Sequence, residues 1–390
     1  MTATEKLYDQ DAYIREFDAS VLSIERTDND TLSIVLDRTA FFPEAGGQSS
    51  DRGTLDGLKV IHVQIHADGV ISHICRNGGT VPSIGKTVHG EILWERRHTF
   101  MQHHTGEHVF SGLVNRDYGY ANVGFHLSDH ICTMDYNGVL TDEAVMRLEK
   151  ECNEWIYRNV PVTCAYPDEG ALQGMAYRCK GELSPPIRIV AIDGVDTCAC
   201  CAPHVRSTGE IGLLKVIEAK SYKGGVRLTI LCGRKAFHDY LDRFSVLADA
   251  SHLLSSQAAD VPERITALLE DRFALNGKVS ALQEERLSEM INAVPDTQAN
   301  ALFFVEDIPT KSIRHAVNSL MEQHDGCCGI FCGNDAKGYQ FILGSQTIDM
   351  THLADRLRKE LPAKCGGSPR MLQGQTSSEQ AQIRTLLSAL

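Results

Sequence analysis

Short runs that alternate apolar and polar residues fill the first quarter of the chain. Examples are VLSIERTDNDTLSIVLD and LKVIHVQIHADGVISHIC, with glycine-containing turns between such runs. A period of two residues is typical of strands that bury one face. We therefore expect residues 1–90 to form a small β-barrel.

Helices and strands mix over residues 91–240. Residues 96–114 lack proline and predict a helix. Residues 142–158 predict another, with Thr141 as its N-cap and acidic residues in its first turn. Strand-like runs follow at 187–193 and 213–217. This block is expected to be an α/β core.

Residues 241–295 are predicted to be helical. Asp260 and Glu263 have the spacing of a capping box. Apolar residues then recur at steps of three and four, which favours a helical pair or a short coiled coil: Ile265, Leu268, Leu275, Val279 and Leu282. Such a seam is consistent with a homodimer or with an intramolecular hairpin. Residues 296–390 alternate strand-like and helical runs, so we expect a C-terminal α/β domain and a multidomain α+β chain overall.

Composition and charge narrow the class of protein. Of 390 residues, 43% are hydrophobic and 23% charged, which are globular values. No run approaches the roughly 18–20 apolar residues of a membrane span, and the N-terminus lacks an apolar signal core. We expect a cytoplasmic protein with no membrane partner.

The net charge of -13 argues against a general nucleic-acid binder. From Lys215 to Lys235, however, six basic residues stand against Glu218 alone. This local stripe is consistent with phosphate contacts or with a solvated sheet face.

Thirteen cysteines in a chain of this length favour reduced thiols or metal ligands over disulfides. Most stand alone in apolar surroundings and are expected in the core: Cys75, Cys132, Cys152 and Cys232. The group Cys327, Cys328 and Cys332 lies in an apolar run and is also expected to be buried.

Two pairs of residues have the spacing of metal ligands. His104 and His108 are four apart within a predicted helix, so both imidazoles project from one face. Cys200 and His204 are also four apart, directly after a predicted strand. Three nitrogens and one sulfur suit tetrahedral Zn²⁺.

Neighbouring residues leave the ligand assignment open. His103 is rotated by about 100° from His104 on a helix, and the residue four positions after it is a glutamate, which favours His104 with His108. Cys198 and Cys201 are alternatives to Cys200, although a packed or spare thiol is the simpler interpretation of each.

Three ordered blocks carry a family resemblance: FFPEAGGQSSDRG, HTGEHVFSG and ACCAPHVRSTGEIG, with KGGVRLTILCGRKAF following. Together they resemble the AlaX and alanyl-tRNA synthetase editing family over residues 20–240. The last block, which ends CGGSPRMLQG, resembles the C-terminal domain shared by alanyl-tRNA synthetases and DHH-type phosphoesterases, and this makes the chain similar to the long form of AlaX.

The resemblance implies one zinc ion per chain, tRNA(Ala) as partner, and hydrolysis of Ser-tRNA(Ala) and also Gly-tRNA(Ala). By position, it places the zinc ligands at His104, His108, Cys200 and His204, and a substrate-facing glutamine at Gln48. The chain departs from the family's usual Cys-Gly-Gly-Thr-His by reading Cys-Cys-Ala-Pro-His, and its C-terminal glycine tract is thinner.

Ester hydrolysis also needs groups that support an oxyanion and select the amino acid. Gly46 and Gly47 would let backbone amides approach the substrate, unless they form only a hairpin turn. Thr105 is a candidate for the group that forms a hydrogen bond with the serine hydroxyl, or else it is a residue on the helix surface. Glu44 and Glu107 are candidate bases, with solvated carboxylates as the simpler interpretation. Zinc could activate water, polarise the substrate or only position it.

Two other functions remain open: a zinc hydrolase of a non-tRNA substrate, and a tRNA-binding accessory factor with structural zinc. A complete synthetase is disfavoured, because the chain lacks room for an aminoacylation domain. A zinc metalloprotease is excluded, because HTGEH places the glutamate beside the second histidine rather than the first.

Overall fold

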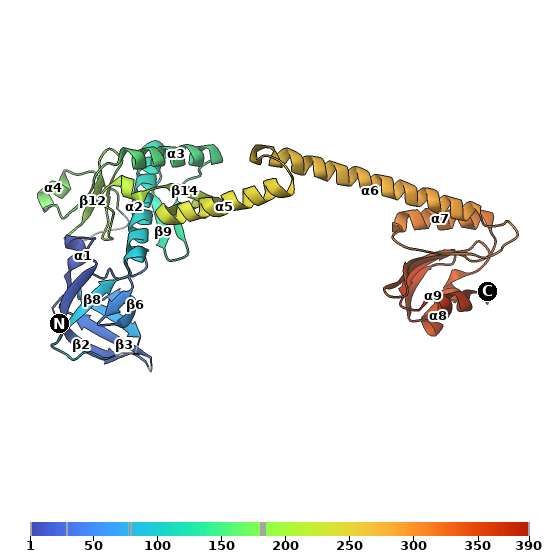
Figure 1. Cartoon of the computed structure of the whole chain (residues 1–390), viewed down its shortest axis with the longest axis horizontal. Coiled ribbons are helices and arrows are strands. Elements are labelled where there is room, and N and C mark those ends of the chain that lie inside the picture. Colours follow the sequence, from blue (N-terminus) through green and yellow to red (C-terminus); the bar gives the residue numbers. More distant parts are fainter. Residues whose placement is uncertain (1, 29, 77, 79, 180–184, 389–390) are drawn as a thin grey trace. The chain divides into compact units, whose positions relative to one another are not determined.

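The computed structural model describes residues 2–28, 30–76, 78, 80–179 and 185–388. They form two compact units, Met1–Leu247 and Ala248–Leu390 (Figure 1). Helix α5 (Gly233–Leu253) runs across the division between them. The expected multidomain α+β class is confirmed.

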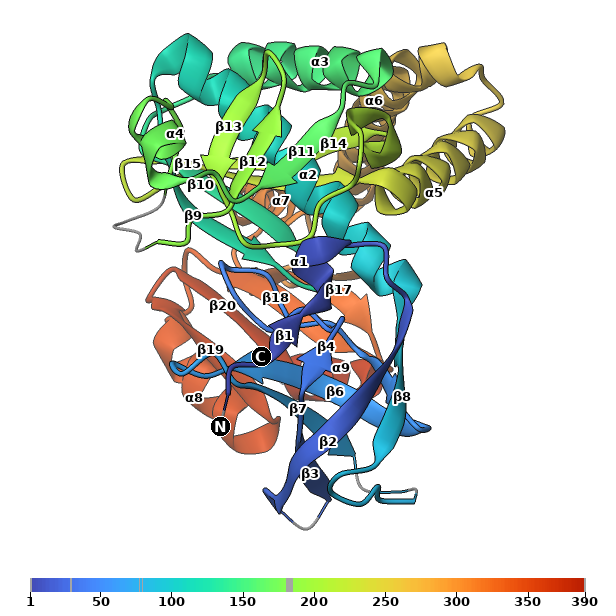
Figure 2. The ribbon, with the colours of Figure 1, turned by 90° about the vertical axis from the view of Figure 1, so that its left-hand side faces the viewer.

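A closed six-stranded barrel begins the first unit, as the alternating pattern predicts (Figure 2). Its strands, in barrel order, are β2 (Glu16–Arg26), β3 (Thr31–Leu36), β7 (Ile71–Arg76), β6 (Leu58–Ile65), β5 (Gly53–Leu55) and β8 (Thr87–Ile92). Inward-facing apolar side chains fill it, including Ile34, Leu55 and Val63. Before the barrel, β1 (Glu5–Lys6) pairs in parallel with β4 (Arg38–Thr39), and α1 (Leu7–Gln10) follows β1.

Helix α2 (Trp94–Tyr118) is the central element of the rest of the first unit. Every residue from Phe100 to Val114 is buried, so the helix is covered on all sides. It contacts β15 (Gly225–Cys232) of one sheet and β13 (Asp196–Ala199) of another (Figure 2). The helix is longer at both ends than the predicted 96–114.

Two antiparallel sheets and two further helices complete this core. One sheet has the order β14-β15-β10-β9 and the other β11-β12-β13. The remaining elements are β9 (Asn122–Leu127), β10 (Cys132–Tyr136), α3 (Asp142–Arg158), β11 (Val162–Ala165), α4 (Glu169–Gln173), β12 (Ile189–Ile192), the 3-10 helix η1 (Thr208–Ile211) and β14 (Leu214–Tyr222). Thr141 caps α3 by accepting from the amide of Ala144, as expected.

The second unit is a five-stranded sheet of order β16-β17-β18-β20-β19. Helix α7 (Thr310–Gln323) contributes to one apolar cluster, and α8 (Met350–Glu360) and α9 (Gln380–Leu387) contribute to another. The strands are β16 (Ala301–Val305), β17 (Cys328–Asn334), β18 (Gly338–Gly344), β19 (Ala363–Ser368) and β20 (Met371–Thr376). Cys327 and Cys328 are buried and Cys332 is half-buried.

Helix α6 (Val261–Asn292) follows the short turn η2 (Ala258–Asp260). The predicted capping box is wrong: the Asp260 side chain makes no capping bond, because its backbone is already helical; the helix begins at Val261, and Pro262 lies in its first turn. No helix in the described part of the chain combines the length and apolar character that crossing a bilayer requires.

The predicted apolar seam of α6 is largely exposed within its own unit. Its members are between 46% and 64% exposed: Ile265, Leu268, Leu275, Val279 and Leu282. Among the described residues of α6, Val261 is buried at its start, and Leu287 and Ile291 join the cluster around α7 toward its C-terminal end.

Candidate metal centre and active site

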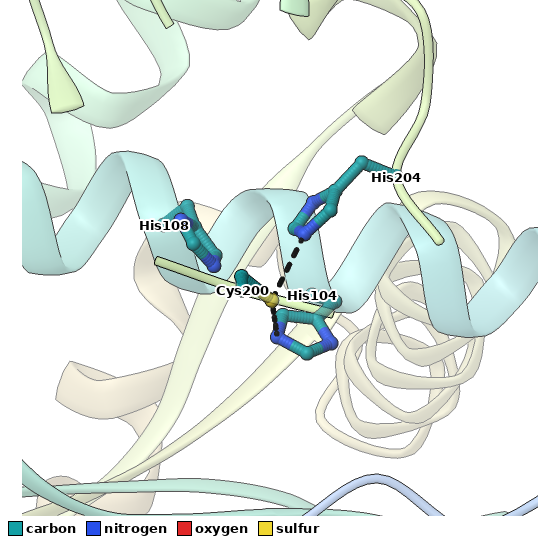
Figure 3. Close-up of side chains that lie close together, drawn as sticks. All are labelled: His104, His108, Cys200 and His204. Atoms are coloured by element: carbon teal, nitrogen blue, oxygen red, sulfur yellow. Dashed lines mark hydrogen bonds between the residues drawn. The ribbon is translucent and has the colours of Figure 1, made fainter. Parts of the chain in front are cut away.

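Four predicted ligands from two distant segments meet in the first unit (Figure 3). His104 and His108 project from one face of α2, and Cys200 and His204 follow β13. One ligand atom from each residue lies within 4.8 Å of those from the other three.

Their separations fit a single ion. Cys200 Sγ is 3.5 Å from His104 Nε2 and 3.4 Å from His204 Nε2. A sulfur and a nitrogen bound to one tetrahedral zinc, at about 2.3 and 2.0–2.1 Å, lie about 3.5 Å apart. Burial lowers the pKa of His204, so the imidazole is neutral as a ligand must be. Burial raises the pKa of the Cys200 thiol, and a cation bound there would displace its proton. The residues present therefore fit Zn²⁺.

Each histidine is held through its other ring nitrogen. Nδ1 of His104 lies 2.7 Å from Gln48 Oε1, and Nδ1 of His204 lies 3.0 Å from Thr105 Oγ1. Nδ1 of His108 lies 2.9 Å from Asp196 Oδ2. These contacts leave all three Nε2 atoms for the ligand cluster, which is how metal-binding histidines are usually oriented.

A tight turn places Gln48 against His104. Gly46 and Gly47 both have positive φ, and Ala45 and Gln48 exchange backbone hydrogen bonds across them. This is the two-residue hairpin geometry that favours glycine. A Cβ at Gly47 would lie 2.2 Å from the carbonyl oxygen of Phe125, so the site itself excludes a larger residue there. The Gln48 side chain is fully buried, and its Nε2 has no hydrogen-bond partner among the described residues.

The turn that carries Cys200 and His204 is held by Arg188. This buried guanidinium donates to the carbonyl oxygens of Cys200 and Ala202 at 3.0 and 2.8 Å. Where the editing family that the sequence resembles has two glycines in this turn, this chain has Cys201 and Ala202. Arg188 supplies the bonds that fix its backbone.

Two glycines let α2 approach the strands that bear the site. A Cβ at Gly106 would lie 2.7 Å from Cys232 Sγ on β15. A Cβ at Gly112 would lie 2.5 Å from the carbonyl oxygen of Val195, directly before β13. Since real Cβ contacts are longer, both positions need glycine for this packing.

A pocket of about 320 Å³ opens beside the ligand cluster. Its volume lies at the lower end of the range for small-molecule sites. Its lining includes His104, His108, Cys200, Gly46, Glu107 and Arg178. Gln48 and Thr105 do not line it; both act on the pocket only through the histidines that they contact.

The neighbours of the predicted ligands stand outside the group of four, although Cys198 and Cys201 line the same pocket. His103 Nε2 accepts from the amide of Cys232, and burial lowers the pKa of His103 to about 4. Cys201 is exposed. Cys198 is buried and forms a second close group with His108 and Asp196.

Glu44 and Glu107, the two candidate general bases, differ in their exposure to solvent. Glu44 is exposed, as expected. Glu107 is instead buried, and its Oε1 accepts from Ser111 and from Asn122. Its Oε2 lies 3.8 Å from His108 Nε2. Thr105 is also fully buried, so the helix-surface interpretation of it is wrong.

Sequence reasoning missed Asp196 and Arg178. Although burial alone would raise the pKa of Asp196, the hydrogen bonds from His108 and Arg178 lower it, so the carboxylate is charged. The alternation Asp196, Cys198, Cys200 places all three on one face of an extended strand and was the available signal. Arg178 lies in an irregular segment and offered none.

The basic stripe is largely neutralised in the folded chain. Carboxylates from other segments pair with Lys215 (Glu149, 2.7 Å), Arg227 (Asp135, 2.6 Å) and Arg234 (Glu95, 2.9 Å). Lys220 pairs with Glu218 at 2.9 Å. The local excess of positive charge that the sequence shows is therefore mostly cancelled.

Comparisons with known proteins match this chain to two family models and to several relatives. Residues 187–229 match the model described as threonyl and alanyl tRNA synthetase second additional domain, and residues 4–96 that described as tRNA synthetases class II (A). The alanyl-tRNA editing protein AlaX-L of Pyrococcus horikoshii is 32% identical over 289 residues, which cover 72% of this chain and 71% of that protein. The chain belongs to the alanyl-tRNA editing family. The resemblance drawn from three sequence blocks is thus confirmed.

Relatives of the editing family include much longer proteins. The alanine–tRNA ligase of Ignicoccus hospitalis is 29% identical over 74% of this chain and 33% of that ligase. That of Halobacterium salinarum is 32% identical over 87% of this chain and 38% of that ligase. This chain therefore corresponds to roughly a third of these ligases.

Proposed function

We propose that this protein is a trans-editing hydrolase that removes serine, and also glycine, from mischarged tRNA(Ala) in a site with one zinc ion. The carrying observation is the convergence of His104, His108, Cys200 and His204 beside a pocket of about 320 Å³, in a chain of the alanyl-tRNA editing family. We place this activity in the cytoplasm, where translation occurs.

The residues around the pocket support distinct roles in this reaction. Zinc, when bound, supplies a Lewis acid that can polarise the ester or a water molecule. Gly46 lines the pocket with open space where a Cβ would stand, which allows close approach of the ester carbonyl, whereas Gly47 packs against Phe125 and shapes the turn. Gln48 and Thr105 contact His104 and His204 and orient these two rings toward the ligand cluster.

Selection of serine over alanine requires a polar group that meets the hydroxyl. Glu107 is a better candidate than Thr105, because it lines the pocket whereas the Thr105 hydroxyl is engaged by His204 and the amide of Val205. A site that bonds a substrate hydroxyl rejects analogues without it by roughly 10⁴-fold. Glycine lacks the hydroxyl and is expected to react more slowly than serine.

Deacylation of three charged tRNAs tests the proposal. Purified protein is incubated with Ser-tRNA(Ala), Gly-tRNA(Ala) and Ala-tRNA(Ala), with and without a chelator. We expect serine to be released roughly 10³- to 10⁴-fold faster than alanine, loss of activity on chelation, and recovery when zinc is added back. Binding of tRNA without ester cleavage would favour an accessory factor. Neither binding nor cleavage would favour a hydrolase of another substrate, which the acidic net charge supports.

We also propose that α6 pairs with α6 of a second copy of the chain. Its exposed apolar residues recur at coiled-coil steps, and an isolated helix does not leave such a seam in water without cost. Leu268→Lys with Leu275→Lys is expected to convert a dimer into a monomer in light scattering of the full chain. The matched control is Arg264→Lys, on the same helix. A monomeric wild-type protein would refute the pairing.

A further inference from the structure

One of the three histidines is supported differently from the other two. Nδ1 of His104 contacts an amide oxygen and Nδ1 of His204 contacts a hydroxyl. Nδ1 of His108 instead contacts the carboxylate of Asp196 at 2.9 Å. Asp196 is the first residue of β13, and its side chain is only 2% exposed. A buried carboxylate needs compensation to remain charged.

Arg178 provides that compensation. Its Nε lies 2.6 Å from Asp196 Oδ1 and its terminal nitrogen 2.7 Å from Oδ2, so both oxygens are engaged in a fork. The Arg178 amide donates to the carbonyl of Thr197, and its own carbonyl accepts from the amide of Ala199. Backbone and side chain together therefore fasten this segment along β13. Arg178 also lines the pocket beside the ligands.

A second ion between His108, Asp196 and Cys198 is the competing interpretation of this group, since their ligand atoms lie within 4.8 Å of one another. Two observations oppose it. The guanidinium already occupies both carboxylate oxygens, and its positive charge would repel a cation placed there. His108 Nδ1 is likewise taken up by Asp196.

We propose that Asp196 and Arg178 are a positioning pair that fixes the ring of His108 and makes it the strongest nitrogen donor of the zinc site. The carboxylate accepts a hydrogen bond from Nδ1–H, which fixes the tautomer and increases the electron density at Nε2, as partners of metal-bound histidines do. Arg178 keeps that carboxylate charged and aligned in a buried setting. This inference rests on the proposed zinc site. It also requires that neither Asp196 nor Arg178 binds the zinc ion directly.

The close packing of α2 against β13 supports the same role. Asp196 can reach His108 because Gly112, four residues after His108, presents no side chain: a Cβ there would lie 2.9 Å from Asp196 Cβ. The interaction is thus built into the contact between the two elements that supply the ligands, and does not depend on a surface loop.

Zinc affinity of the full chain tests the pair. Asp196→Asn preserves the shape and removes the charge, and Arg178→Lys preserves the charge and removes the fork. Both are expected to weaken zinc binding about 10- to 100-fold in chelator competition. Asp193→Asn, an exposed carboxylate in the adjoining turn, is the matched control and is expected to stay within about twofold. Asp196→Glu is expected to restore part of the affinity.

Cobalt substitution separates positioning from a general structural effect. In Asp196→Asn the thiolate-to-cobalt band should persist while the ligand-field bands shift, because Cys200 still binds and His108 binds more weakly. Thermal unfolding without metal checks the apo fold; if Asp196→Asn does not fold, Arg178→Lys decides. Unchanged zinc affinity in the folded variants, or two zinc ions per wild-type chain, would overturn the pair.

The outcomes distinguish this inference from the proposed function. A wild-type chain that binds one zinc but releases no amino acid contradicts the editing activity and leaves the pair intact. A wild-type chain that deacylates Ser-tRNA(Ala), with zinc affinity unaffected in Asp196→Asn, contradicts the pair alone.

Discussion

Replacing Cys200 with alanine is expected to reduce bound zinc from one ion per chain to nearly none and to slow deacylation of Ser-tRNA(Ala) by about 10²- to 10³-fold. Cys200 is the only sulfur in the close group of four ligand atoms, and its Sγ touches two of the three histidines. Without the thiolate, three neutral imidazoles hold the ion less tightly than the full set of four, and where the ion is lost the several kcal/mol that a metal contributes to charge stabilisation is lost with it. Elemental analysis of metal and single-turnover deacylation measure the two effects.

Cys201→Ala is the matched control for that substitution. Cys201 is adjacent in sequence, is exposed and stands outside the group of four ligand atoms, so we expect full zinc content. Because Cys201 lines the pocket, the control compares metal content and not the rate. The opposite pattern, with metal lost in Cys201→Ala and retained in Cys200→Ala, would mean that the ligand assignment is reversed. Retention of metal in both variants would point to Cys198, which is buried beside His108.

Local patterns in the sequence anticipated those parts of the site that depend on spacing. His104 and His108 share a helix face because they are four residues apart, and the barrel follows from the alternation of apolar and polar residues. The contacts of Gln48 with His104 and of Thr105 with His204 join residues 56 and 99 positions apart. No periodic pattern in the sequence reveals contacts over such separations. The sequence therefore could not show that Gln48 and Thr105 contact the histidines and do not line the pocket.

The charge around the basic stripe and the burial of Glu107 could not be predicted either, because both depend on contacts between residues far apart in the sequence. The basic stripe has an excess of positive charge along the sequence, but Glu149, Asp135 and Glu95 reach it from other elements. Glu107 looked like a solvated carboxylate because it lies between two histidines in a polar stretch. Its burial is determined by Ser111 and Asn122, and the latter lies on β9.

Removing the Asp51 carboxylate is expected to destabilise the first unit by about 3–5 kcal/mol, the loss that follows when a buried ion pair is broken from one side. Arg97, at the start of the buried part of α2, is fully buried and bonds Asp51 through Nε at 2.9 Å. It also donates to the carbonyl oxygens of Ala12 and Ala40, at 2.9 and 2.6 Å. In Asp51→Ala the guanidinium keeps its charge in an apolar setting, and the amide of Phe42 loses the acceptor that it has at 2.7 Å.

Chemical denaturation followed by tryptophan fluorescence measures this loss, because both tryptophans, Trp94 and Trp155, lie in the first unit. Arg38→Ala, which removes an exposed pair with Glu5, is the control and should change stability by less than about 1 kcal/mol. Asp51→Leu combined with Arg97→Met removes both charges and is expected to recover part of the loss. Recovery should be incomplete, because the carbonyls of Ala12 and Ala40 and the amide of Phe42 remain unpaired. A single variant as stable as Arg38→Ala would mean that water enters this junction between helix and barrel and solvates the guanidinium.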